Sequence, residues 1–206
     1  TKQSVVFGIG NFGLGLRTPS SLFYLNSLFY LPIIKYFSFQ ITSVLILGFS
    51  NLVLLIKIKN DIIEKKYNFL TIYNLLVFIF INIFFYRISE HGTDKSAQIL
   101  IFLLIIELIF LSNIKKIKSL NLFYVYLLTA IIISLKAFFI LYLVFILPLF
   151  FLIKSKKKNY IDTVIFLVLN RYFYLSLFLI SLVFFTYFIN TGCIIYPIKT
   201  TCFESL

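Results

Sequence analysis

The stretch Arg87-Ile-Ser-Glu-His-Gly-Thr-Asp-Lys-Ser-Ala-Gln98 is the densest polar segment of a chain that is otherwise rich in Leu, Ile and Phe. It lies between two long apolar runs, residues 69–86 and 99–114. Uninterrupted apolar runs of this length are typical of helices that cross a lipid bilayer. The polar stretch therefore predicts a loop that joins two membrane helices.

The composition supports the same class of protein. Hydrophobic residues make up 61% of the chain, charged residues only 13%, and the mean hydropathy is +1.04. A soluble domain needs more polar surface than this, so we expect an all-α, polytopic membrane helix bundle of about six transmembrane helices. The runs that we expect to span the membrane are residues 37–56, 69–86, 97–114, 120–135, 137–153 and 163–189.

The fourth and fifth of these spans form one apolar run interrupted by Lys136. A single helix through the run would place this lysine near the bilayer centre, at a cost of about 2.5–3.5 kcal/mol. We therefore predict two short helices with a tight turn at Lys136. Residues 22–34 are too few to span about 30 Å of hydrocarbon, and they predict an interfacial helix instead.

The lysines gather in short clusters at residues 57–66, 115–118 and 154–158. The positive-inside rule predicts that these loops are cytoplasmic, which places residues 1–36, the polar stretch and residues 190–206 on the periplasmic side of a bacterial inner membrane. The net charge of +12 does not indicate nucleic-acid binding, because no basic face or stacking platform accompanies the lysines. The expected partner is the lipid bilayer. We expect one membrane domain, residues 1–206, that is an internal fragment of a longer chain.

The polar stretch holds Glu90, His91 and Asp94, which could act as general acids and bases. Zinc usually takes three or four protein ligands, so this set does not support a metal site, and no cofactor is predicted. The alternative is a solvated loop in which the acids pair with Arg87 and Lys95. Asp94 could also cap a helix that begins at residue 96.

Three further residues outside this loop are candidates for a role. Glu107 is a carboxyl group inside an apolar span, which is a functional suspect; the alternative is a structural glutamate that pairs with Asn82 or Lys136. Cys193 and Cys202 lie on the expected periplasmic side, where a disulfide would close a short loop. The alternative is two free thiols.

Three segments carry a resemblance to a known family. They are Val5-Val-Phe-Gly-Ile-Gly-Asn-Phe-Gly-Leu-Gly-Leu-Arg-Thr-Pro-Ser-Ser-Leu-Phe-Tyr24, Ser134-Leu-Lys136 and Asn190-Thr-Gly-Cys-Ile-Ile-Tyr-Pro197. Together they resemble a family of uncharacterised bacterial multi-pass proteins that looks like a distant branch of the GT-C membrane glycosyltransferases. The third segment departs from that family, because Cys193 and Ile194 replace its usual Asn-Pro.

The resemblance implies transfer of a sugar from a polyprenyl-phosphate-linked donor on the periplasmic face, in cell-envelope glycan assembly. It also implies a catalytic Asp or Glu in a loop before residue 1. The substrate-binding candidates that follow from it are Arg17, Glu90, His91, Asp94 and Lys136. The alternative is a polysaccharide polymerase or a transporter-like protein that handles lipid-linked saccharides without this chemistry.

Overall fold

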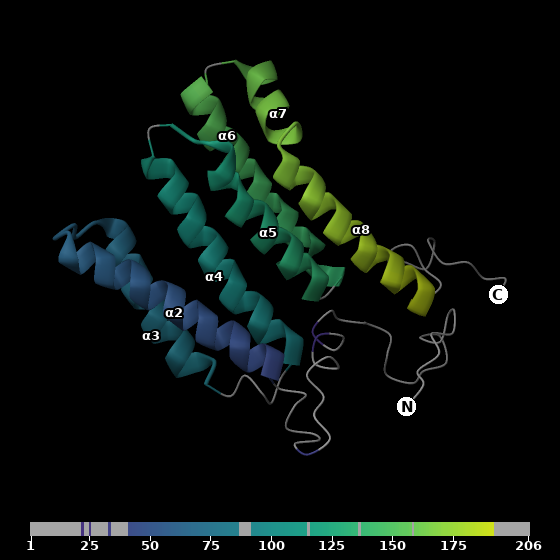
Figure 1. The fold of residues 1–206 in the computed structure, drawn as a ribbon, viewed down its shortest axis with the longest axis horizontal. Helices are drawn as coiled ribbons and strands as arrows, with labels where there is room; N and C mark the ends of the chain where they lie inside the picture. Colours follow the sequence, from purple (N-terminus) through teal and green to yellow (C-terminus); the bar gives the residue numbers. More distant parts are fainter. Residues whose placement is uncertain are drawn as a thin grey trace.

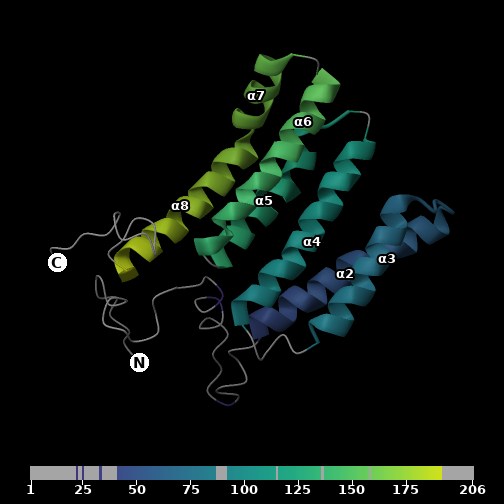
Figure 2. The same ribbon diagram turned by 180° about the vertical axis from the view of Figure 1, so that it is seen from behind.

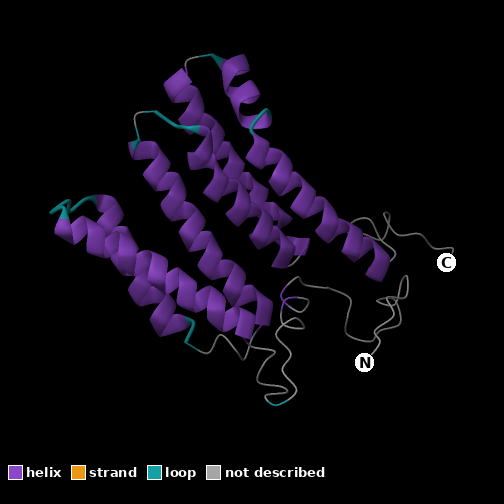
Figure 3. Ribbon diagram, viewed as in Figure 1, coloured by secondary structure: helices purple, strands orange, loops and turns teal. Residues whose placement is uncertain are grey.

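The computed structural model describes residues 41–86, 92–114, 116–135, 137–157 and 159–191, together with Leu22, Leu25 and Ile33. In these ranges all regular structure is helical, which confirms the predicted all-α class (Figure 3). The elements, shown in Figure 1, are α2 (Ile41–Ile63), α3 (Phe69–Phe84), α4 (Gly92–Asn113), α5 (Ser119–Leu135), the 3-10 helix η3 (Ala137–Phe145), α6 (Ile146–Lys157), α7 (Tyr160–Val168) and α8 (Arg171–Thr191).

Several of these helices have the length and composition needed to cross a membrane. Of the described segments, Ile41–Ile63, Asp94–Asn113 and Phe139–Lys156 are each long and apolar enough to cross a bilayer, and α7 with α8 would make a fourth, bent span. Helices α3 and α5 are apolar but shorter. The structure thus supports a membrane helix bundle with three or four long spans, and six spans remain a prediction.

Helix α4 lies between two groups of helices, with the α2–α3 hairpin on one side and α5 on the other (Figures 1 and 2). The side chains toward α5 recur at helical spacing and belong to the larger apolar core: Ala97, Leu100, Ile101, Leu104, Leu108 and Leu111. The side chains toward α2 and α3, Ile99 and Ile106, belong to a smaller core with Leu54, Val77 and Ile81. The two faces explain why α4 is apolar nearly all round.

The first span differs from the prediction. A helix over residues 37–56 followed by a charged loop was expected, but α2 continues through that segment to Ile63. It ends in a paired turn in which Lys65 N–H donates to the Ile62 carbonyl (3.1 Å) and Lys66 N–H to the Asp61 carbonyl (2.9 Å). Lys65 has the left-handed φ of 53° that this kind of helix end requires. The extra helical turns carry polar side chains, including Lys57, into the bundle.

The predicted division of the long apolar run is confirmed, and the tight turn at Lys136 stays a prediction. The apolar run divides after Leu135, and α5 packs against η3, the element that follows it. Lys136, on which the prediction rested, lies outside the described residues.

The last span, expected as one helix over residues 163–189, is broken. Helices α7 and α8 meet at an angle of 57°. Asn170 at the break accepts a hydrogen bond from Tyr172 N–H (3.0 Å) and so caps α8. Tyr126 of α5 donates its hydroxyl to the Leu167 carbonyl (3.0 Å), one of the groups that the end of α7 leaves without a helical partner. These side-chain bonds replace the missing helical ones and make the break stable inside an apolar bundle.

Candidate functional site

A cavity of about 520 Å³ lies between the α2–α3 hairpin and helices α4 and α5. In Figure 1, α2 and α4 lie close where α2 begins and diverge toward the end where α2 leads into α3. We call this space the α2–α5 cavity. It is lined by Val53, Lys57, Asn60, Asp61, Leu70, Asn74, Leu103, Glu107, Phe110, Tyr124, Leu127 and Leu128.

An ion pair forms one wall of the cavity. The Lys57 ammonium of α2 donates a hydrogen bond to the Glu107 carboxylate of α4. The side chains are only 28% and 16% exposed, and the ammonium lies 5.9 Å from the ring centroid of Phe110. Glu107 is thus the intramembrane acid that the sequence singled out, but its partner is Lys57 and not Asn82. Pairing lowers the cost of placing either charge in an apolar bundle.

Asn74 of α3 is the other distinctive lining residue. It is 1% exposed, and neither its amide oxygen nor its amide nitrogen has a hydrogen-bond partner. Leaving a buried polar group without a partner costs about 1–3 kcal/mol. Because Asn74 also lines the α2–α5 cavity, rotation of its side chain toward the cavity would let a bound molecule, including water, satisfy the amide.

Asp61 lies at the polar end of the cavity, near the end of α2. Its carboxylate accepts a hydrogen bond from the Thr71 hydroxyl (2.6 Å), and the Asn68 N–H donates to the same hydroxyl oxygen (3.4 Å). Residues 68 and 71 lie at the start of α3. The contact fixes the carboxylate and ties the two helices of the hairpin together.

Not every polar group between these helices belongs to the cavity. Asn51 of α2 and Asn82 of α3 exchange two amide hydrogen bonds, of 3.1 and 2.8 Å. Asn82 also donates to the Phe78 carbonyl (2.8 Å). Because both amides have partners, this pair holds the hairpin together and leaves nothing for a ligand to satisfy.

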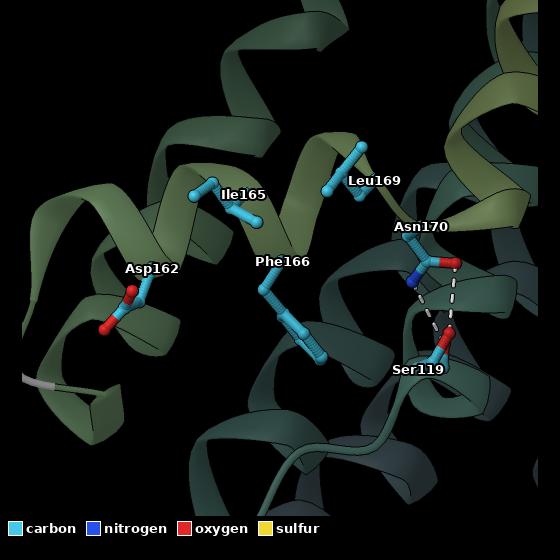
Figure 4. Close-up of a pocket in the computed structure, with 6 residues that line it drawn as sticks. All are labelled: Ser119, Asp162, Ile165, Phe166, Leu169 and Asn170. Atoms are coloured by element: carbon cyan, nitrogen blue, oxygen red, sulfur yellow. Dashed lines mark hydrogen bonds between the residues drawn. The ribbon is translucent and has the colours of Figure 1, made fainter.

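A second cavity, of about 580 Å³, opens at the break between α7 and α8, and we call it the α5–α7 cavity. Figure 4 shows Asn170 and Ser119 at one end, joined by hydrogen bonds of 3.1 and 3.3 Å, and Asp162 at the other end. Asp162 accepts from the Asn159 amide (3.0 Å). The polar side chains that line this cavity thus already have protein partners, and we rank it below the α2–α5 cavity.

The residues predicted from the sequence fall elsewhere. Asp94 is exposed in the first turn of α4, which begins at Gly92 and not at residue 96 as predicted. Asp94 therefore lies inside the helix and does not cap it, and its negative charge is favourable at this N-terminal end. It lies 13 residues from Glu107, about 20 Å along the helix. The other predicted site residues and both cysteines lie outside the described residues: Arg17, Glu90, His91, Lys136, Cys193 and Cys202.

Sequence reasoning missed most of the cavity. Lys57 and Asp61 were assigned to a loop, although Val53, Lys57 and Asp61 recur every four residues and would face one way on a helix. Asn74 was not singled out. The only sign of Asn74 in the sequence is that it is a polar residue within an otherwise apolar run. No group of three or more His, Cys, Asp or Glu side chains that could hold a metal occurs in the part of the chain that the structure describes.

Comparison with known proteins identifies a family but no activity. No curated protein and no solved structure matches the chain. The model of DUF8201, a domain of unknown function, matches residues 2–205. The chain therefore belongs to the DUF8201 family.

Proposed function

We propose that the protein binds a lipid-linked saccharide within the membrane, in the α2–α5 cavity. The observation that carries this proposal is a cavity among membrane helices that combines an ion pair with an unpaired, buried amide. Charged residues inside membrane bundles typically mark substrate or ion pathways. Ligand cavities likewise combine apolar walls with a few placed polar groups.

The lining divides in the way that an amphipathic ligand requires. Polar side chains come mainly from the last turns of α2 and from α3, and most of the apolar ones come from α4 and α5. Leu103, Leu127 and Leu128 give one wall that is suited to a hydrocarbon chain. The saccharide part of the proposal comes from the resemblance to GT-C-like proteins.

The position of the cavity favours binding or transport over glycosyl transfer. Its lining residues lie toward the end of α2 and the start of α5, the end of the bundle that carries the lysine clusters. That end is predicted to be cytoplasmic, whereas the resemblance implies a donor site on the periplasmic face. We therefore propose a transporter-like protein for lipid-linked saccharides, and an enzyme that forms glycosidic bonds, whether polymerase or glycosyltransferase, is the less supported candidate.

A photo-crosslinking amino acid placed at Leu128 tests the proposal. After irradiation of cells that make the variant, mass spectrometry should find an adduct that contains both a lipid chain and sugar residues. The same amino acid at Phe178, a residue of α8 that is 59% exposed, is the control and should capture ordinary phospholipid. Identical phospholipid adducts at both positions would contradict the proposal.

A further inference from the structure

We infer that the polar end of the α2–α5 cavity recognises the hydroxyl groups of the bound saccharide and not its phosphate, with Asn74 as the residue that binds them. The inference rests on the proposed function and makes it more specific. It places the sugar inside the cavity and leaves the phosphate link outside.

The charges of the cavity argue against a phosphate. The lining contains one cation, Lys57, and two carboxylates, Asp61 and Glu107. The ammonium already pairs with Glu107. A phosphate would have to break that pair and then face two carboxylates among apolar helices, where like-charge repulsion is only weakly screened.

The chemistry of Asn74 selects the kind of group that can bind. Its unpaired amide offers one acceptor, the carbonyl oxygen, and a donor NH₂ group side by side. A phosphate oxygen can only accept and an ammonium can only donate, so each would leave half of the amide unsatisfied. A hydroxyl both donates and accepts, and two neighbouring hydroxyls on a sugar ring match both halves of the amide.

The surrounding side chains also suit a sugar. The Asp61 and Glu107 carboxylates are acceptors for further hydroxyl groups. Phe110 and Tyr124, which are 40% and 55% exposed, offer aromatic surface for the apolar face of a sugar ring. The α5–α7 cavity lacks this combination, because its polar side chains are already paired with one another or with neighbouring residues.

Binding to the purified protein in zwitterionic nanodiscs tests the inference. The probes are dodecyl maltoside and dodecyl phosphate, which share a chain and differ in the headgroup, both below their micellar concentrations. We expect the maltoside to bind more tightly than the phosphate. The N74L substitution should weaken maltoside binding about tenfold, through loss of two hydrogen bonds. The double variant N51L/N82L is the control, because it removes a pair of amides that lies outside the cavity without leaving either amide unpaired, and it should leave the affinity unchanged.

The outcomes separate the two proposals. Tighter binding of dodecyl phosphate, or maltoside binding that N74L does not change, overturns the inference while the cavity remains a lipid site. If neither probe binds and the Leu128 crosslink yields only phospholipid, water alone satisfies Asn74, and both proposals fail. Asn74 has no protein hydrogen bond to lose, so N74L should fold, and a loss of binding will report on the ligand.

Discussion

The two faces of α4 differ in the kinds of side chain that they bury. Toward α5, the helix buries mainly leucines in the larger apolar core, and the nearest charged group is the Lys156 ammonium, which donates to the Leu111 carbonyl (2.7 Å) at the end of α4. Toward α2 and α3, the apolar core is smaller, and beside it lie the Lys57–Glu107 ion pair and the unpaired Asn74. Polar groups inside a membrane bundle cost free energy, so their concentration on one face indicates that this face serves a purpose other than packing.

The largest effect should come from breaking the ion pair. K57L or E107L alone leaves an uncompensated charge in the bundle and should reduce the free energy of unfolding by about 3–5 kcal/mol. The double variant K57L/E107L removes both charges and should recover most of that loss. Denaturant unfolding in mixed micelles measures the free energy of unfolding of the wild type, both single variants and the double variant. Additive losses in the double variant would mean that the two side chains do not interact.

A truncation on the opposite face should be nearly as costly. L104A creates a cavity in the α4–α5 core, because Leu104 is fully buried there, and should lower the free energy of unfolding by about 2–5 kcal/mol. In contrast to the ion-pair variants, we expect no second substitution to recover the stability that L104A loses. L177A, on the exposed surface of α8, is the control and should cost much less in the same assay. Equal losses for both would argue that α4 is not packed against α5.

The Asn74 amide should lower stability when no ligand is present. N74L replaces an unsatisfied buried amide by an apolar side chain of similar size, and should raise the free energy of unfolding by about 1–3 kcal/mol. Thermal unfolding in lipid nanodiscs without added ligand measures the gain. A loss of stability would show that the amide has a partner in the folded protein. Stability that rises as binding falls is the pattern expected of a binding residue.

The smallest effect concerns the turn that joins α2 to α3. Lys65 holds a left-handed conformation that glycine adopts without strain, so K65G should raise the free energy of unfolding by about 0.5–1 kcal/mol. K59G, inside α2, is the matched control and should destabilise the protein instead. A destabilising K65G would mean that the turn has a different conformation in the membrane.

The sequence predicts the apolar face of α4 better than the polar one. The apolar spacing along α4 and the charge of Glu107 are visible without coordinates, as is the division of the apolar run after Leu135. The partner of Glu107 is not, because Lys57 looks like a loop residue until α2 is seen to continue to Ile63. The local sequence around a charged residue does not show whether that residue lies in the last turns of a helix or in the loop that follows. Only the packing of the hairpin against α4 distinguishes them.

The break between α7 and α8 shows the same limit. Residues 163–189 have no proline and are apolar throughout most of their length, so composition predicts one continuous helix. The break depends on hydrogen bonds that Asn170 and Leu167 make to α5, a helix about 40 residues earlier in the chain. Tertiary contacts of this kind leave only a single asparagine as a sign in the sequence.

The most direct test of the α2–α5 cavity is a cryo-electron microscopy structure in nanodiscs made from the lipids of the host membrane. We predict density in the cavity within hydrogen-bonding distance of Asn74, with the Lys57–Glu107 pair intact beside it. A structure in which α2 closes onto α4, Asn74 bonds to a protein group and Lys57 faces away from Glu107 would contradict the account.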